Sequence, residues 1–318
     1  MLKRVFAGIL PVLALFVANE KAWAGDAPVE LRSAMPDPAT GWYGNVHLSS
    51  GSDTNPSFTA LVGMVNVGGK VAYEGGVGHF GYQADADIWY SDLAWSYPAS
   101  TAFSGNSGEL DSALHLTYQL DDSKKLGLFV SVSDFNNKLR ETNGVLLPGG
   151  FQSIGSNMGI TGLGVESLWT FGSGTTVQVR AAGVSRIYNS TTTDTGAGPT
   201  TTGGFQFNLA DYGAVVALGA NQHLGDNWSL HGDLGLMNMT LGSTSSTEMA
   251  WGAVGGFDYT FDGMPLSLGL QGGYESINYN GAVTNQITTS GKLTYSFGGP
   301  SKGAQGKLFR SGLLNFFF

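Results

Sequence analysis

The segment Ile287–Phe297, Ile-Thr-Thr-Ser-Gly-Lys-Leu-Thr-Tyr-Ser-Phe, alternates between two kinds of residue. Successive side chains of a β-strand point to opposite sides, so a period of two gives the strand two different faces. The pair Tyr295/Phe297 ends the more apolar face. The pattern therefore predicts a strand with one face toward lipid and one toward a polar interior. The apolar face carries Ile287, Thr289, Gly291, Leu293, Tyr295 and Phe297, and the polar face carries Thr288, Ser290, Lys292, Thr294 and Ser296.

The same alternation recurs along the chain from Trp42 onward, and aromatic residues recur near the ends of the segments. One such segment is weak evidence for a strand, whereas a long series is strong evidence for a large antiparallel β-structure. We predict twelve strands: 42–49, 62–75, 82–91, 112–120, 125–134, 158–169, 175–185, 210–224, 228–236, 248–261, 265–274 and 287–297.

The connections between these strands alternate in length. Those after even-numbered strands are short, as in Gly225–Asn227 and Asp262–Met264, which carry turn residues. Those after odd-numbered strands are long, as in Asp92–Asp111 and Arg186–Leu209. A soluble β-sandwich also has many short strands, but it does not require this alternation and needs more two-sided burial. Transmembrane barrels combine short turns at one end with long loops at the other.

The start of the chain predicts export. Lys3 and Arg4 precede an apolar run, Val5–Val17, that is too short for a membrane-spanning helix, which needs about 20 residues. Residues 1–24 thus read as a signal peptide cleaved between Ala24 and Gly25, followed by a polar leader over residues 25–41. The chain has no cysteine, which excludes disulfides and thiolate metal sites. Its net charge of −9 disfavours nucleic-acid binding.

In signal peptide, strand pattern and Tyr295-Ser296-Phe297 ending, the chain resembles the porin-like outer-membrane β-barrel proteins of Gram-negative bacteria. The resemblance is at the level of the class. It implies an all-β, transmembrane, antiparallel up-and-down barrel of about 12 strands over residues 42–297, located in the bacterial outer membrane. It also implies contact with outer-membrane lipid and lipopolysaccharide, recognition by the barrel assembly machinery, and a possible homo-oligomer.

One feature departs from that class, in which a terminal aromatic residue of the last strand is the recognition signal. Here residues 298–318 follow the predicted closing strand and end in Phe318. Either Tyr295 and Phe297 end the barrel and the remainder is a tail, or 308–318 is the true terminal strand and Phe318 the signal. We favour the tail, because a thirteenth strand would make the count odd and place the C-terminus outside.

Several charged or ionisable residues are predicted to face the interior. Asp85 and Asp87 share one face, as do His231 and Asp233, and either pair is a candidate for acid–base chemistry. No H-E-x-x-H, G-x-S-x-G or Walker motif accompanies them, so we expect neither a metal, a cofactor nor an enzyme. We interpret these side chains as lining a pore, with acids outnumbering bases. The predicted lining residues are Asp85, Asp87, His115, Arg180, His231, Asp233, Asp258 and Lys292.

The loop Phe135–Asn157 is unusually apolar for an external segment. It contains Lys138 and Arg140, followed by Leu146, Leu147 and Phe151. We predict that it folds into the barrel mouth as a constriction. The leading functional hypothesis is passive diffusion of small hydrophilic solutes with a mild cation preference. The alternative is a non-conducting structural or surface-interaction barrel that acts through its external loops.

Overall fold

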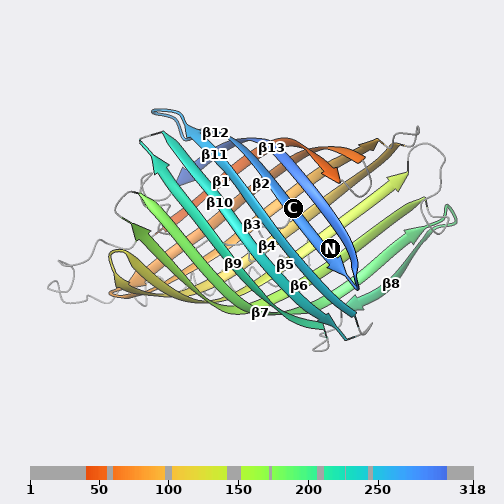
Figure 1. Cartoon of the computed structure of the whole chain (residues 1–318), viewed down its shortest axis with the longest axis horizontal. Coiled ribbons are helices and arrows are strands. Elements are labelled where there is room, and N and C mark those ends of the chain that lie inside the picture. Colours follow the sequence, from red (N-terminus) through yellow and green to blue (C-terminus); the bar gives the residue numbers. More distant parts are fainter. Residues whose placement is uncertain are drawn as a thin grey trace.

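The computed structural model describes residues 41–55, 60–96, 102–141, 152–171, 174–205, 211–225, 227–242 and 246–298. These residues form one antiparallel sheet that closes into a barrel (Figure 1). None of the described segments contains a helix long and apolar enough to cross a membrane. The strands are β1 (Gly41–Asn55), β2 (Ala60–Val77), β3 (Phe80–Ser96), β4 (Ala102–Asp121), β5 (Lys124–Glu141), β6 (Ser153–Phe171), β7 (Thr175–Asp194), β8 (Pro199–Phe205), β9 (Asp211–Leu224), β10 (Trp228–Leu241), β11 (Ser246–Thr260), β12 (Leu266–Tyr279) and β13 (Ala282–Gly298).

Twelve of these strands make the barrel wall, and each predicted segment overlaps one of them. Neighbours in sequence pair with one another, and β6 pairs with β7. The first and last strands close the ring, with Val46 opposite Tyr295 and Leu48 opposite Leu293. The prediction that 287–297 is the closing strand and pairs with 42–49 is therefore confirmed.

The outer face is apolar and ends in aromatic residues. Leu48, Leu128 and Leu163 are exposed although they lie in mid-strand, which is costly in water and favourable in lipid. Aromatic rings collect at the end of the barrel that carries the short turns, where Trp228 packs 5.0 Å from Tyr259 between ring centroids. The outward aromatics at this end include Trp42, Phe80, Tyr118, Trp169, Trp228, Tyr259, Tyr295 and Phe297.

The strands are longer than the sequence pattern indicates. They contain 14 to 20 residues in the barrel wall, whereas a spanning strand needs about 9–11. Most of the predicted long loops are therefore shorter than expected, because the strands continue beyond the membrane with polar residues that show no alternation. The predicted loop Glu275–Gln286 reduces to a two-residue turn, Asn280-Gly281, in which both residues have positive φ (50° and 88°). Asn-Gly is a strong signal for such a hairpin turn.

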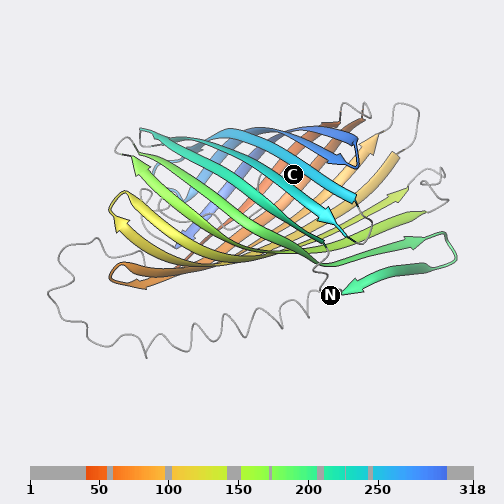
Figure 2. The same cartoon turned by 60° about the horizontal axis from the view of Figure 1, so that its bottom comes forward.

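The predicted loop Arg186–Leu209 also contains regular structure. β7 continues to Asp194, and β8 pairs with its upper part, with Thr192 opposite Thr201. This hairpin extends away from the barrel wall (Figure 2). β8 is the strand that the sequence pattern missed, because its threonines and glycines give no apolar face.

Candidate functional site

The inward face of the barrel carries the predicted lining residues. Asp85, Asp87, His115 and Arg180 are buried, and His231, Asp233, Asp258 and Lys292 are partly exposed. Along each strand these positions alternate with the exposed apolar positions of the outer face, so the predicted orientation of all eight agrees with the structure. What the sequence did not indicate is which of them meet.

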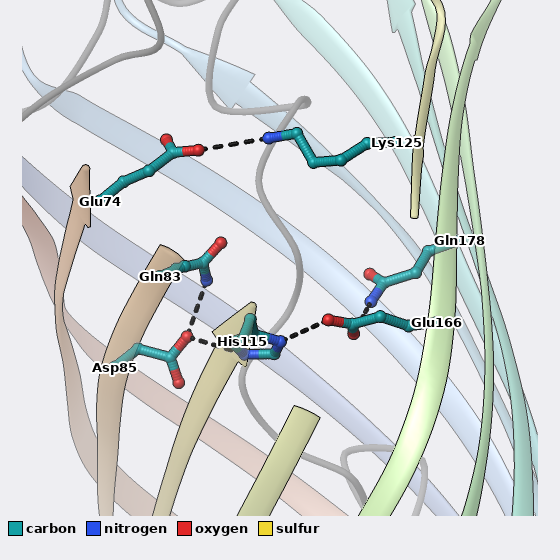
Figure 3. A network of polar contacts seen from close by, with 7 residues as sticks. All are labelled: Glu74, Gln83, Asp85, His115, Lys125, Glu166 and Gln178. Atoms are coloured by element: carbon teal, nitrogen blue, oxygen red, sulfur yellow. Dashed lines mark hydrogen bonds and ion pairs between the residues drawn. The ribbon is translucent and has the colours of Figure 1, made fainter. Parts of the chain in front are cut away.

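His115 on β4 is the centre of an inner polar network, which we define as Glu74, Gln83, Asp85, His115, Lys125, Glu166 and Gln178. Its imidazole is fully buried between two carboxylates, with Nδ1 2.6 Å from Glu166 Oε1 and Nε2 3.4 Å from Asp85 Oδ2. A carboxylate only accepts hydrogen bonds, so the Nδ1–H of His115 donates to Glu166, while Nε2 lies within ion-pair distance of Asp85. Figure 3 shows these side chains converging inside the barrel.

Two glutamines orient the carboxylates of this network. Gln83 donates from Nε2 to Asp85 Oδ2 at 2.7 Å, and Gln178 donates from Nε2 to Glu166 Oε2 at 3.3 Å. Lys125 on β5 reaches Glu74 on β2 at 3.2 Å, although β3 and β4 lie between these strands in the sheet. The network therefore ties together side chains from six strands, β2 to β7.

A glycine makes the central contact possible. Glu166 on β6 and His115 on β4 are separated by β5, whose inward residue opposite Glu166 is Gly127. A Cβ at Gly127 would lie 2.7 Å from both Cγ and Oε1 of Glu166. The missing side chain leaves the space through which Glu166 passes over β5.

A second cluster, also close to the short turns, likewise has two side chains that meet across a glycine. Asp258 on β11 lies 3.0 Å from Nδ1 of His231 and 3.7 Å from Nζ of Lys292. Gly269 on the intervening strand β12 is paired with both Asp258 and Lys292, and a Cβ there would collide with the Asp258 carboxylate. The predicted pairing of His231 with Asp233 is replaced by the contact with Asp258 on the neighbouring strand.

A third site of this kind joins β1 and β3. His47 and Trp89 meet over Gly68 of β2, with ring centroids 3.9 Å apart. A Cβ at Gly68 would lie 2.7 Å from Cε3 of Trp89 and would also collide with the His47 ring. No sequence signal indicated that Trp89 would contact a histidine two strands away.

The inner wall is not polar throughout. Phe129 (2% exposed) is paired with His115 on one side and begins a row of apolar and glycine residues on the other. Val215 (1% exposed) and Met239 belong to the same buried cluster. Cross-strand pairing forms one continuous row, which we call the buried belt: Glu74, Gln83, His115, Phe129, Gly164, Ala182, Val215, Met237, Ala250 and Ile277.

The predicted constriction loop is only partly within the described residues. Lys138 and Arg140 belong to strand β5 and not to a loop, and both are exposed. This placement corrects the predicted boundary, because β5 continues to Glu141 through a polar sequence. Leu146, Leu147 and Phe151 lie outside the described residues, as do Ala24, Gly25 and Phe318.

Within the described part of the chain, no group of three or more His, Cys, Asp or Glu is arranged to hold a metal ion. Asp85 and Asp87 engage different neighbours: Asp85 contacts Gln83 and His115, whereas Asp87 is paired in the register with Asp111 and Lys70. The geometry is that of a charged lining held by cross-strand contacts.

No protein-family description matches the chain, and no curated protein matches it. Among solved structures, an outer membrane channel from Pseudomonas putida F1 is similar, with a TM-score of 0.51 and 11% identity over 86% of this chain and 100% of that chain. The translocator domain of autotransporter NalP from Neisseria meningitidis has a TM-score of 0.44 and 14% identity, over 92% of this chain and 98% of its own. The fold shared with the Pseudomonas channel, together with the apolar outer face, is that of an outer-membrane β-barrel.

Proposed function

We propose that this outer-membrane barrel is a channel for the passive diffusion of small hydrophilic solutes, with a mild preference for cations. The observation that carries the proposal is the charge of the inner wall. Inward-facing carboxylates occur on most strands, and inward-facing cations are fewer. The acids are Asp53, Glu74, Asp85, Asp87, Glu109, Asp111, Glu166, Asp211, Asp233, Glu248, Asp258 and Glu275, and the cations are Lys70, Lys125, Arg180, Arg186 and Lys292.

Rings of carboxylates favour cations in a narrow pore, because they lower the electrostatic energy of a positive ion that has lost part of its hydration shell. The buried belt is the part of the inner wall whose side chains have little contact with solvent. The cluster of His231, Asp258 and Lys292 lies close to the short turns and is more open to water. We infer that this cluster contacts a permeating ion.

Planar-bilayer recordings with purified protein test the proposal. Under a KCl gradient we expect discrete conductance steps whose reversal potential is biased toward the potassium equilibrium potential. Asp258→Asn should reduce this bias, and Lys292→Gln should increase it. Lys124→Gln is the matched control, because Lys124 is exposed on the outer face at the short-turn end. An anion-biased reversal potential, or identical values in all four proteins, would refute the charge argument.

One observation favours a second candidate, a non-conducting structural or surface-interaction barrel. Phe129, Val215, Met237 and Met239 are buried although they face inward. A barrel whose interior is filled by packed side chains also requires apolar side chains on its inner wall, because they exclude water there. Silence in the bilayer recordings, from protein that is folded by an independent criterion, would support this candidate over the channel.

We further propose that the barrel is not an enzyme. The inward His115 and His231 are both engaged by carboxylates of other strands, which accounts for their placement without catalysis. A hydrolytic activity that is lost in His231→Ala or in Asp85→Ala would contradict this proposal. A homo-oligomer and recognition by the assembly machinery remain further proposals, to be tested by cross-linking in membranes.

A further inference from the structure

One side of the inner wall is apolar and faces an interior that is otherwise rich in carboxylates. We define this inner apolar patch as the buried, inward side chains Phe129, Ala182, Val215, Ala217, Met237 and Met239. They come from β5, β7, β9 and β10, belong to one contact cluster, and are each 1–8% exposed. The patch is therefore a continuous apolar part of the wall that has little contact with solvent.

The opposite wall is too far away to cover this patch. Strands about 4.8 Å apart and tilted by about 40° give a twelve-stranded barrel a diameter of roughly 25 Å between backbones. About eight strands enclose an interior that side chains just fill, so twelve leave a space across which opposite side chains do not meet. The low exposure of the patch in a lumen of this width calls for a covering segment, because apolar surface is stabilised when it is removed from water.

Residues 299–318, which lie outside the described residues, have the composition that such a cover requires. The second half of this tail is mostly apolar, through Leu308, Phe309, Leu313, Leu314, Phe316, Phe317 and Phe318. The tail also contains three cations, Lys302, Lys307 and Arg310, and no Asp or Glu. Carboxylates outnumber cations on the described inner wall, so the charge of the tail complements that of the lumen.

The closed ring leaves the tail no place in the barrel wall. β13 pairs with β12 along one edge and with β1 along the other, up to Gly298 opposite Tyr43 at the short-turn end. The ten residues from Gly298 to Leu308 reach up to about 33 Å, which exceeds the diameter of the barrel. Across the lumen, Phe129 lies five residues into β5 from the same end, and Ala217 lies seven residues before the end of β9. The apolar half of the tail is therefore long enough to reach the patch.

We propose that residues 308–318 dock inside the barrel, with their leucine and phenylalanine side chains on the inner apolar patch. The leader over residues 25–41 also joins the wall at the short-turn end, but it carries three acids and one arginine, so the acidic wall repels it. The docking does not depend on whether the interior conducts. In a conducting barrel it would narrow the lumen on one side.

Disulfide trapping tests the proposal, because the chain contains no cysteine of its own. Full-length double variants in lipid vesicles combine Ala217→Cys with Leu314→Cys, Asn315→Cys or Phe316→Cys, three consecutive positions that differ in side-chain direction. After mild oxidation, we expect at least one pair to form an internal disulfide, seen as a mobility shift of the denatured, unreduced protein. The same tail variants combined with Val216→Cys should form at least about 10-fold less, because Val216 is on the outer face and a disulfide requires Cα atoms within about 7 Å.

Two controls make every outcome decisive. Ser52→Cys/Thr289→Cys should become oxidised, because the hydroxyl oxygens of these residues lie 3.1 Å apart. If this control is oxidised and no tail pair with Ala217→Cys is, the proposal is overturned. Cross-linking of Ala217→Cys to Val29→Cys of the leader instead of the tail, or a disulfide between two copies of the chain, would also overturn it.

A second measurement keeps the barrel free of any cross-link. Ala217→Cys alone should react slowly with a water-soluble maleimide, and adding Leu313→Ser/Leu314→Ser should raise this rate by about 10-fold or more, because two leucines lose their apolar contact. Asn315→Ser is the matched control in the tail and should leave the rate unchanged. Equal rates with and without the two leucines would contradict the docking. All of these variants keep Phe318, and heat-modifiable migration on gels shows that each is folded.

Discussion

Gly127 offers the sharpest test of how the interior is built. The substitution Gly127→Ala adds one methyl group on the inner face, 2.7 Å from Cγ and Oε1 of Glu166. Glu166 cannot give way freely, because its carboxylate is held by His115 at 2.6 Å and by Gln178 at 3.3 Å. We expect the alanine to displace the carboxylate and to break its contact with the imidazole.

The expected magnitude follows from two opposing effects. A hydrogen bond to a charged group contributes about 1.5–3 kcal/mol to stability. Alanine in a strand interior is more favourable than glycine by roughly 0.5–1 kcal/mol, because less backbone entropy is lost on folding. Gly127→Ala should therefore lower the free energy of unfolding by about 1–2 kcal/mol. Urea titration of the barrel in lipid vesicles, followed by tryptophan fluorescence, measures this difference.

Two comparisons separate the contact from a general effect of alanine. Gly183→Ala on β7 places its Cβ where no atom lies within 4 Å, so it should be neutral or stabilising. In a Glu166→Ala background, Gly127→Ala should likewise become neutral or stabilising, because no carboxylate remains to be displaced. If Gly127→Ala destabilises the protein equally with and without Glu166, the proposed passage of Glu166 over β5 is wrong.

Three further predictions concern the turn, the predicted constriction and the tail. Gly281→Ala forces a side chain into the left-handed region at φ 88° and should destabilise the β12–β13 hairpin by about 1–2 kcal/mol in the same urea titration, whereas Asn280→Gly should have little effect. Deletion of Val145–Phe151 should raise single-channel conductance if this segment narrows the mouth, and unchanged conductance would count against that hypothesis. Truncation after Gly298 should leave membrane assembly intact, as judged by heat-modifiable migration, and complete loss of assembly would instead favour Phe318 as the recognition residue.

The sequence allowed the number of barrel strands, their direction and the closing pair to be predicted, because lipid on one side and a polar interior on the other impose a period of two. It did not allow the strand ends to be predicted. Beyond the membrane both faces of β5 meet water, so residues such as Lys138 show no alternation while the backbone pairing continues. The Asn280-Gly281 turn was available from the sequence, but it was overlooked inside a segment interpreted as a long loop.

The interior contacts could be predicted only in part. Alternation gave the direction of His115 and Asp85 along their own strands, but contact between strands depends on register, and a shift by one pair would separate them. The glycines that let side chains pass, such as Gly127, cannot be distinguished in the sequence from glycines that serve turns. The buried belt was not anticipated, because its apolar members occur singly on six different strands.

The closing pair of strands has a consequence for how the protein reaches this structure. Ser52 and Thr289, whose hydroxyl oxygens lie 3.1 Å apart, are separated by 237 positions along the chain. One edge of β1 therefore has no partner until β13 has been made and delivered, and an unpaired edge invites pairing with other chains. Contacts of such long sequence separation form slowly. We therefore expect the yield of closed barrels to depend on how well the β1 edge is protected during this interval. The strength of any single contact should matter less.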